Sequence, residues 1–372
     1  GTPSTAISEY WDGDIDWYAP AEISDQIFVN SSQRKITTEG LINSSAKILP
    51  VGTILFTSRA GIGKTAILAK ESCTNQGFQS IIPHKKELDS YFIFSRTEEL
   101  KRYGETVGAG STFVEVSGKQ MSNMNLMMPS LAEQTKIGEL FANLDNLITL
   151  HQRKVEKLQK IKKSCLQNLF PQNNQNTPKI RFKNFTDEWV EKKYKNIGQC
   201  LSGGTLSYED LDKNGIYKCI LYGELYTRYD YIIKNIVFRT NKLGNKVIKN
   251  DILFPQSTTV DAISLISPAC INDDEAQTSG VFAIRPHKNI DGNFITYYTK
   301  GNFYQRNKLA KNAQGLTIVH LYYQSIKDET ILIPNLAEQC KISEFFTKLD
   351  KLISLQQRKV EKLKNIKKAL LN

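Results

Sequence analysis

The stretch LAEQTKIGELFANLDNLITLHQRKVEKLQKIKKSCLQNL, from Leu131 to Leu169, occurs twice in this chain of 372 residues. It returns as LAEQCKISEFFTKLDKLISLQQRKVEKLKNIKKALLN from Leu336 to Asn372. With an offset of 205, residues 129–167 and 334–372 agree at 25 of 39 positions. An internal repeat constrains the architecture more strongly than any local signal. Two copies of one segment, each following a stretch of different sequence, predict a pseudo-symmetric molecule with two domains.

Both copies have the apolar spacing of a long helix that pairs with another helix. Intervals of four and three residues alternate, which is the pattern of a coiled-coil seam. The seam positions are Ile137, Phe141, Leu144, Ile148, His151, Val155 and Leu158 in the first copy and Ile342, Phe346, Leu349, Ile353, Gln356, Val360 and Leu363 in the second. Ser130 with Glu133, and Asn335 with Glu338, have the spacing of helix caps. We therefore predict two spacer helices.

Charge favours an antiparallel pair of these helices. The first half of each copy carries its acids and the second half is strongly basic. An antiparallel arrangement places each basic end beside the acids of the partner, whereas a parallel one sets basic against basic. The middles of the two helices then meet, so His151 and Gln356 should be neighbours. Polar seam residues of this kind can fix the register of a coiled coil.

The stretches before the two helices predict two domains of one α+β fold with divergent sequences. Short apolar runs alternate with turn signals, and Ile54–Phe56 in the first stretch matches Ile252–Phe254 in the second. The second stretch opens with Arg181–Trp189, which has no counterpart in the first, so we expect the N-terminal segment of the first domain to be missing. The predicted parts are 1–129 (first domain), 130–170 (helix), 171–178 (linker), 179–333 (second domain) and 334–372 (helix).

Composition bounds the class of protein. Lys and Arg outnumber Asp and Glu by 49 to 38, and the net charge of +11 favours a polyanionic partner, the alternative being a solvated basic surface. No apolar run approaches the roughly 18 residues that a membrane span needs. The six cysteines form no C-x-x-C pair and no signal peptide is recognisable. They predict reduced thiols in a cytoplasmic protein.

Searches for catalytic and metal-binding motifs give no candidate. Gly61-Ile62-Gly63-Lys64-Thr65 resembles the end of a P-loop, but Ser58 stands where that motif requires glycine. The P-D…E-x-K pattern of many nucleases is missing, as are the N-P-P and D-P-P runs of amino-methyltransferases. The four histidines are scattered. We therefore predict neither a catalytic site nor a metal site.

Basic and aromatic residues are concentrated in two regions of the second domain, 217–231 and 297–311. Arg and Lys hold phosphates and also read guanine edges, so these residue types suit DNA. The alternative is half-buried strand tyrosines beside a solvated basic face. The candidate DNA contacts here are Tyr222, Tyr226, Arg228, Arg306, Lys308 and Lys311.

Together these residues resemble the DNA-specificity subunit of type I restriction-modification enzymes. The signature L-A-E-Q-x-K-I…L-D-x-L-I-x-L…R-K…L…K-K is present at 131–163 and again at 336–368. Thr57–Gly63 is similar to the S-R-A-x-I-G turn of that family, Tyr222–Thr227 to a second recurrent segment, and Arg181–Trp189 to the usual opening of a target-recognition domain. The resemblance covers essentially the whole chain.

The resemblance implies a non-catalytic subunit of a bacterial defence system. Each target-recognition domain would read one half of a bipartite, asymmetric site in double-stranded DNA. The helices would set the spacer and dock two methyltransferase subunits, which bind S-adenosylmethionine and methylate adenine. Motor-nuclease subunits, which use ATP and magnesium, would complete the complex. Arg59 and Lys64 are candidate DNA contacts of the first domain only, because Pro255–Asp261 replaces the turn in the second.

Two other classes of function remain open at the level of sequence. One is a coiled-coil adaptor whose domains bind proteins, and the other is a nuclease or methyltransferase with an unrecognised site. A DNA reader loses affinity steeply as salt rises, because binding releases counterions. An enzyme would be active as the purified chain alone. If the helices measure the spacer, inserting a few residues in the first of them lengthens the gap between half-sites.

Overall fold

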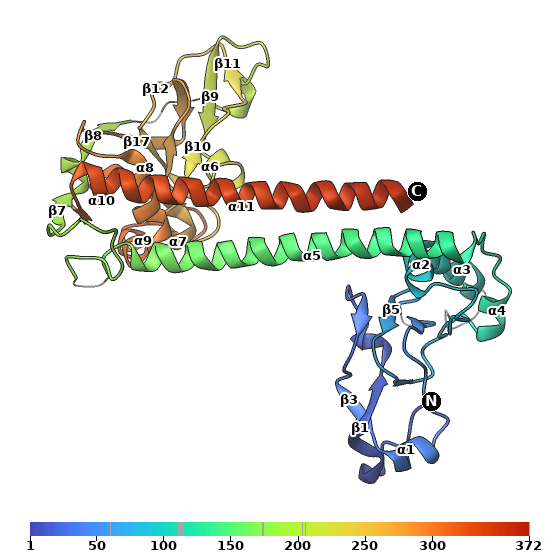
Figure 1. Cartoon of the computed structure of the whole chain (residues 1–372). Coiled ribbons are helices and arrows are strands. Elements are labelled where there is room, and N and C mark those ends of the chain that lie inside the picture. The colour runs from blue at the N-terminus through green and yellow to red at the C-terminus, as the bar shows by residue number, and fades with distance from the viewer. Residues whose placement is uncertain (60, 110–114, 173–174, 203, 205, 372) are drawn as a thin grey trace. The chain divides into compact units, whose positions relative to one another are not determined.

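The computed structural model describes residues 1–59, 61–109, 115–172, 175–202, 204 and 206–371. Ala60, in the S-R-A-x-I-G-like turn, lies outside them. The chain divides into two compact units, residues 1–152 with 358–372 and residues 153–357. The α+β class is confirmed, since each sheet-containing domain is followed by one uninterrupted helix. These helices are α5 (Leu131–Asn168) and α11 (Leu336–Leu371), drawn green and red in Figure 1.

The strands of the first domain form two small sheets, with orders β3-β1-β6 and β2-β5-β4. In the first sheet β1 is antiparallel to β3 and parallel to β6. In the second, β5 is parallel to β2 and antiparallel to β4. The strands are β1 (Trp11–Tyr18), β2 (Phe28–Val29), β3 (Arg34–Ile36), β4 (Ile54–Phe56), β5 (Thr65–Leu68) and β6 (Cys73–Thr74).

The second domain repeats both strand orders. Strands β11-β9-β16 correspond to β3-β1-β6 and strands β10-β15-β13 to β2-β5-β4, with the same parallel and antiparallel pairs. These strands are β9 (Tyr217–Leu221), β10 (Ile232–Ile233), β11 (Arg239–Thr240), β13 (Ile252–Pro255), β15 (Ala269–Ile271) and β16 (Ala276–Ser279). The predicted match of Ile54–Phe56 with Ile252–Phe254 falls on β4 and β13, which are buried throughout. The two domains therefore share one fold.

Further strands are specific to the second domain. Strand β8 pairs with β17 and so extends the sheet past β13, whereas β7 forms a separate two-stranded sheet with β19. The additional strands are β7 (Val190–Lys193), β8 (Gly198–Leu201), β12 (Asn245–Val247), β14 (Ser257–Thr258), β17 (Val281–Pro286), β18 (Val319–His320) and β19 (Thr330–Ile333). Strand β8, which follows the Arg181–Trp189 segment, thus covers what would otherwise be a sheet edge at β17.

Both domains also contain short helices. The first domain has α1 (Thr38–Ile42), α2 (Ser90–Ser95), α3 (Thr97–Gly108), α4 (Gly118–Ser122) and the 3-10 turns η1 (Ser8–Tyr10) and η2 (Pro20–Glu22). The second has α6 (Glu224–Thr227), α7 (Ala262–Leu265), α8 (Gly292–Thr296), α9 (Phe303–Ala310), α10 (Tyr323–Ile326), the 3-10 turns η3 (Tyr194–Asn196) and η4 (Tyr208–Asp210), and the π-helix η5 (Tyr297–Gly301).

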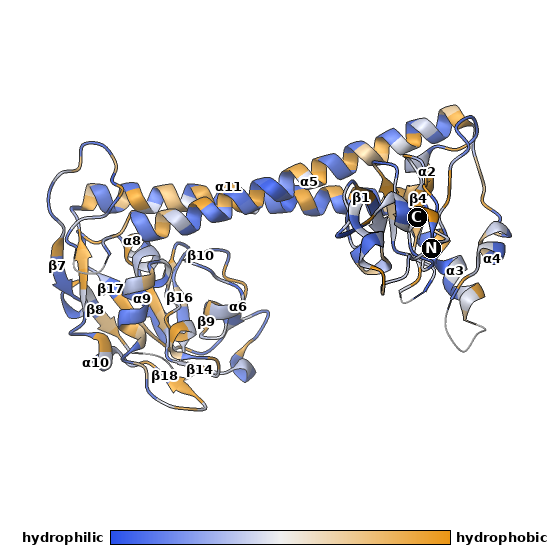
Figure 2. Ribbon diagram, turned by 90° about the horizontal axis from the view of Figure 1, so that it is seen from below, coloured by the Kyte–Doolittle hydropathy of each residue, from blue (hydrophilic) through white to orange (hydrophobic). Residues whose placement is uncertain are grey.

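Apolar residues of the long helices belong to the domain cores. Leu166, Leu169 and Phe170, at and just beyond the end of α5, pack in one cluster with Phe346 of α11 and Phe294 of α8. Figure 2 shows apolar residues alternating with polar ones along both long helices. Over the described residues, no helix combines the length and the apolar character of a membrane span. All six cysteines are free thiols.

Candidate nucleic-acid interface

The glutamine of each L-A-E-Q motif ties its long helix to the preceding domain. Gln134 donates from Nε2 to the backbone oxygens of Glu87 and Pro129, both at 3.0 Å, and accepts from the Asp89 amide at 3.1 Å. Gln339 makes the same three kinds of bond in the second unit, with Asn289, Pro334 and Asp291. Both glutamine side chains are buried. The motif in the repeat therefore has a structural role.

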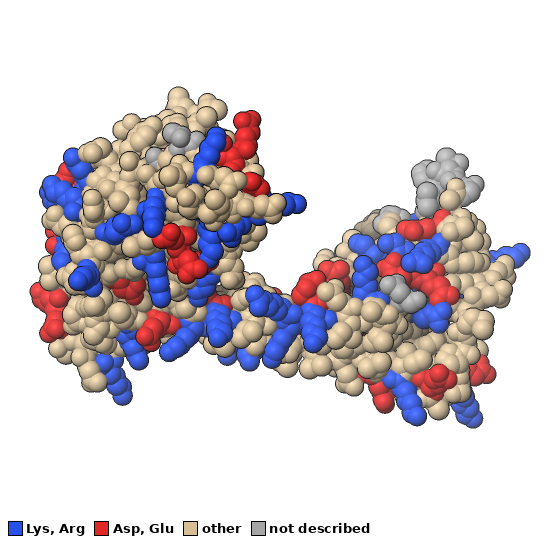
Figure 3. All heavy atoms as spheres, turned by 90° about the horizontal axis from the view of Figure 1, so that it is seen from above, with Lys and Arg blue, Asp and Glu red and all other residues tan. Residues whose placement is uncertain are grey.

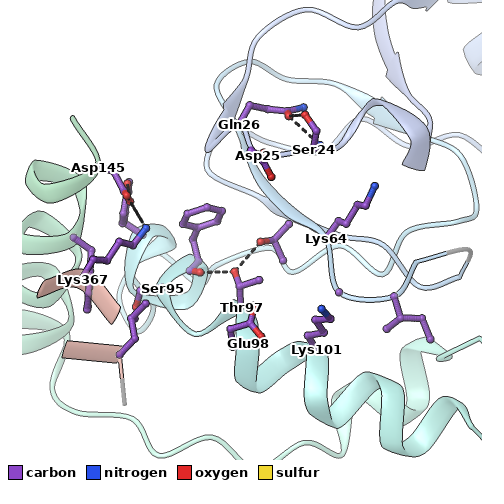
Figure 4. Close-up of a pocket in the computed structure, with 17 residues that line it drawn as sticks. Ser24, Asp25, Gln26, Lys64, Ser95, Thr97, Glu98, Lys101, Asp145 and Lys367 are labelled. Carbon is purple, nitrogen blue, oxygen red and sulfur yellow. Dashed lines mark hydrogen bonds and ion pairs between the residues drawn. The ribbon is translucent and has the colours of Figure 1, made fainter. Parts of the chain in front are cut away.

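An aspartate on each long helix forms an ion pair with the basic end of the other helix and accepts a hydrogen bond from a tyrosine. We call these two contacts, Tyr91–Asp145–Lys367 and Tyr297–Asp350–Lys162, the clasps. Asp145 accepts from the Tyr91 hydroxyl at 2.8 Å and pairs with Lys367 Nζ at 2.6 Å, as drawn in Figure 4. In the second unit, Asp350 accepts from the Tyr297 hydroxyl at 2.8 Å and pairs with Lys162 at 2.6 Å. Burial and the neighbouring carboxylate raise the pKa of both tyrosines, which keeps them protonated as donors.

The two clasps confirm the antiparallel arrangement within each unit. Asp145 and Asp350 occupy the same position of the repeat, and so do Lys162 and Lys367. Each ion pair joins an early residue of one helix to a late residue of the other. The charge complementarity predicted from sequence is therefore realised as two specific and equivalent contacts.

Removing one clasp should destabilise the unit that contains it. In Asp145→Ala, Lys367 and the Tyr91 hydroxyl lose their partner in a site where the carboxylate is 9% exposed. Breaking a fully buried pair costs about 3–5 kcal/mol, and the partial exposure of Lys367 reduces our expectation to about 2 kcal/mol. Thermal unfolding of the purified chain measures this loss. The control is Glu139→Ala, an exposed acid on the same helix. Equal midpoints for the two variants would refute the clasp as a stabilising contact.

The predicted seam residues lie at buried or half-buried positions. Phe141, Leu144 and Ile148 are buried in the first unit, and Ile342, Phe346, Leu349, Ile353 and Gln356 in the second. Ile137, His151, Val155, Leu158, Val360 and Leu363 are half-buried. His151 and Gln356 belong to different units, so their proximity stays a prediction.

Lys64 and Arg59 lie around the turn between β4 and β5. The Thr57 hydroxyl donates to the Gly61 carbonyl oxygen at 2.7 Å and accepts from the Lys64 amide at 3.0 Å. Gly61 and Gly63 have φ values of 106° and 94°, which favour glycine. The turn leads into a strand, whereas a P-loop leads into a helix, so the turn is not a P-loop. Lys64 is exposed and Arg59 half-buried.

The tyrosine-rich segment of the second domain presents its residues in different ways. Tyr222 is exposed, directly after β9. Tyr226 donates from its hydroxyl to the Ser257 carbonyl oxygen at 3.0 Å, and burial raises its pKa. Arg228 Nε lies 3.2 Å from a carboxylate oxygen of the buried Glu224. Tyr222 and Arg228 are both exposed, but the Arg228 guanidinium is paired with Glu224, so Tyr222 has the more available polar group.

Helix α9 separates the other three candidates. Lys308 donates to the Thr330 carbonyl oxygen at 2.9 Å and its hydroxyl at 2.6 Å, so its ammonium holds β19 in place. Lys308 and exposed Lys311 line one cavity of about 450 Å³. Arg306 instead lines a different cavity beside α5. The three residues are close in sequence, but in the structure Lys308 and Lys311 line one cavity and Arg306 lines another.

A buried ion pair that sequence reasoning missed joins the opening segment to α11. Arg181 donates from two guanidinium nitrogens to the two carboxylate oxygens of Glu338, at 2.7 and 2.8 Å. The Asn335 side chain accepts from the Glu338 amide at 3.0 Å and so caps the helix as predicted. The Glu338 carboxylate binds Arg181, however, so this ion pair replaces the bond from the glutamate side chain back to the cap residue that a full capping box would have.

Across the described residues, no group of His, Cys, Asp and Glu is placed to hold a metal ion.

Two copies of one α+β domain, each followed by a helix that clasps the helix of the other copy, define a recognition scaffold with two reading domains. Residues 1–160 and 186–365 match the family model described as the type I restriction modification DNA specificity domain. The chain belongs to this family. Specificity subunits are the non-catalytic DNA-recognition components of type I restriction-modification systems.

Two relatives from Methanocaldococcus jannaschii match the whole chain. The identity is 27% over 410 residues to the type I restriction enzyme MjaIX specificity subunit, covering 100% of this chain and 88% of the relative. It is 22% over 383 residues to the MjaVIII specificity subunit, covering 100% and 87%. The solved type I restriction-modification S subunit from M. genitalium superimposes with a TM-score of 0.59 at 14% identity, covering 97% of this chain and 92% of that one. This structural likeness shows the fold.

Proposed function

We propose that residues 1–129 read one half of a bipartite DNA site and residues 179–333 read the other. The observation that carries this proposal is one strand order repeated in two domains with different exposed side chains. Lys64 is exposed in the first domain, whereas Tyr222 and Lys311 are exposed in the second. Because base readout depends on the side chains that reach the groove, the two half-sites should differ in sequence.

The long helices would set the gap between half-sites and dock two methyltransferase subunits. Helix α5 has 38 residues and spans about 57 Å at the usual rise. Leu147 and Leu150 are exposed on α5, and Leu352 and Leu355 occupy the same repeat positions on α11 and are also exposed. Exposed apolar residues at two equivalent places suit two copies of one protein partner.

The cofactors belong to the partners in this proposal. The methyltransferase subunits would bind S-adenosylmethionine, and motor-nuclease subunits would bring ATP and magnesium for cleavage. The chain described here would contribute recognition and no reacting group, and the complex would act on double-stranded DNA in the cytoplasm.

Co-expression with the cognate methyltransferase subunit, followed by single-molecule methylome sequencing, tests the proposal. We expect one split, asymmetric methylated motif with a constant gap. Tyr222→Ala should relax or weaken recognition in one half only, because this side chain lies in the second domain. A methylated motif that is unsplit, or no motif at all, would overturn the proposal. DNA binding that does not fall with salt would favour the adaptor alternative.

A further inference from the structure

Each clasp borders a cavity, and the two cavities occupy equivalent positions in their units. The cavity of the first unit, about 470 Å³, is lined by Asp25, Lys367 and Leu371. That of the second, about 380 Å³, is lined by Asp230, Lys162 and Leu166. Each of these three pairs is related by the offset of 205 that defines the repeat. The fold has therefore produced the same hollow twice, between a domain and the basic end of a long helix.

The charges that line the two cavities differ. In the first, three cations (Lys64, Lys101, Lys367) face three acids (Asp25, Glu98, Asp145), as Figure 4 shows. In the second, four cations (Lys162, Lys163, Lys300, Arg306) face one acid, Asp230. Asp350 neutralises Lys162 through the clasp, which still leaves the second cavity with an excess of positive charge. The two cavities share a fold, so the excess of positive charge in the second comes from the lining residues that differ between them.

The four positive charges of the second cavity are compensated only in part, by Asp230 and Asp350 and by a hydrogen bond from the Lys300 ammonium to the Asp230 carbonyl oxygen. Lys162 and Lys300 share the carboxylate of Asp230, at 3.3 and 3.4 Å. Their ammonium groups also lie 4.2 and 5.2 Å from the centre of the Tyr231 ring. Lys300 is only 11% exposed, and its burial lowers its pKa, whereas Asp230 is 65% exposed and well screened by solvent. An anion entering the cavity would supply the missing compensation.

Arg306 is held in an orientation suited to an anion. Its Nε donates to the Ile263 carbonyl oxygen at 3.0 Å, which fixes the plane of the guanidinium. Within the described part of the chain, its two terminal nitrogens make no hydrogen bond or ion pair, and neither does the ammonium of exposed Lys163. A guanidinium beside lysines is the usual set of donors for a phosphate group. The π-helix η5, which carries Lys300, is a form of helix that is frequent at functional sites.

We propose that this cavity binds a backbone phosphate of DNA, through Lys163 and Arg306 at its rim with Lys162 and Lys300 behind them. The proposal rests on the DNA-reading function above and adds a contact that carries no base information. Figure 3 shows that Lys and Arg side chains gather along the long helices. A phosphate contact fixes the position of the protein on DNA irrespective of sequence. The electrically balanced cavity of the first unit has no such role.

The test compares Lys163→Gln/Arg306→Gln with the matched pair Lys368→Gln/Lys101→Gln. Lys368 is the repeat equivalent of Lys163, and Lys101 lines the balanced cavity. Each variant is assembled with the methyltransferase subunits and titrated with a duplex carrying the methylated motif and with one carrying scrambled half-sites. We expect the first pair to lower affinity for both duplexes on the order of tenfold and to leave their ratio unchanged. The slope of log affinity against log salt should fall by about one. The matched pair should have the smaller effect on both quantities.

Neutral methylphosphonates placed singly along the duplex locate the contact. A methylphosphonate at one position of the duplex should weaken DNA binding by the wild-type complex. The same methylphosphonate should cause no further loss of affinity in the Lys163→Gln/Arg306→Gln complex. Arg306→Lys should retain more affinity than Arg306→Gln, and thermal midpoints check that every variant is folded. Two results would overturn the phosphate contact while leaving half-site reading intact. One is an equal slope of log affinity against log salt for the two double variants. The other is that every methylphosphonate that weakens wild-type binding also weakens binding by Lys163→Gln/Arg306→Gln. Calorimetric binding of inorganic phosphate with an unchanged DNA salt slope would also overturn it, in favour of a free anion. A wild-type complex that does not distinguish the duplexes would instead overturn the DNA-reading function.

Discussion

Inserting four residues at the middle of each long helix is expected to lengthen the gap between half-sites by one or two base pairs. Four residues advance a helix by about 6 Å and turn it about 40° beyond a full revolution. One base pair of B-DNA advances about 3.4 Å and turns about 35°. The insertion therefore moves a reading domain along DNA by about one to two base pairs and rotates it by about the angle of one base pair. Insertions after Gln152 and Gln357, where the two units divide, leave both clasps unchanged.

Both helices must be lengthened, because each clasp joins one helix to the other. This revises the simpler expectation that an insertion in the first helix suffices. A four-residue insertion into a coiled coil unwinds it locally and preserves the seam. Methylome sequencing of the co-expressed variant should report the same half-sites with a longer gap. The control inserts two residues at the same places, which turns each helix by about 200° and should abolish methylation. Altered half-sites, or the original gap at full activity, would contradict the role of the helices as a spacer.

Phe346→Ala is expected to cost about 4 kcal/mol of the stability of the second unit. Phe346 is 0% exposed and stacks on Phe170 at 5.8 Å and on Tyr297 at 5.0 Å between ring centres. Phe170 in turn stacks on Tyr298 at 4.6 Å. These rings come from α11, from the end of the first helix and from the domain between them. Truncating the central ring leaves a cavity that the surrounding helices cannot close, and the loss is correspondingly large.

Thermal unfolding followed by circular dichroism measures the effect of Phe346→Ala. For a unit of this size we expect a fall in the transition midpoint of about 10 °C. The control is Leu352→Ala, on the same helix but 48% exposed, which should change the midpoint little. Leu352→Ala should instead weaken docking of the methyltransferase subunit. A midpoint for Phe346→Ala close to that of the control would show that the aromatic stack does not hold the unit together.

The helices were predictable because their signals are local and occur twice. The interval of apolar residues, the capping residues and the division of charge are all contained within 39 residues. The sheets were less accessible, because their pairings join distant segments. Strand β9 pairs in parallel with β16, so that Cys219 lies beside Gln277, and nothing near either residue indicates the other. Parallel pairing through a long crossover has no local sequence signature of its own.

The candidate site was predictable in residue type but not in grouping. Arg306 was named from the sequence, whereas Lys162 and Lys300, which share its cavity, were not. They converge because α5 passes beside η5, and spacing along the chain does not encode that approach. Tyr226 and Lys308 were named as DNA contacts, yet their polar atoms bond to backbone oxygens of the domain itself. The clasps did leave a signal, an aspartate and a lysine at identical positions in both copies.

The membership of the first unit has a consequence for how the protein is made. Residues 358–372 complete the unit that begins with residues 1–152, and 205 other residues are translated between them. A ribosome therefore exposes the first domain long before Lys367 emerges to meet Asp145. Until then Asp145 keeps its hydrogen bond from Tyr91 but lacks its ion pair with Lys367, and chaperones and proteases encounter a helix without that contact. In the second unit Lys162 likewise precedes Asp350, but the residues translated between them belong to that same unit, so translational pausing late in the message would burden the first domain more.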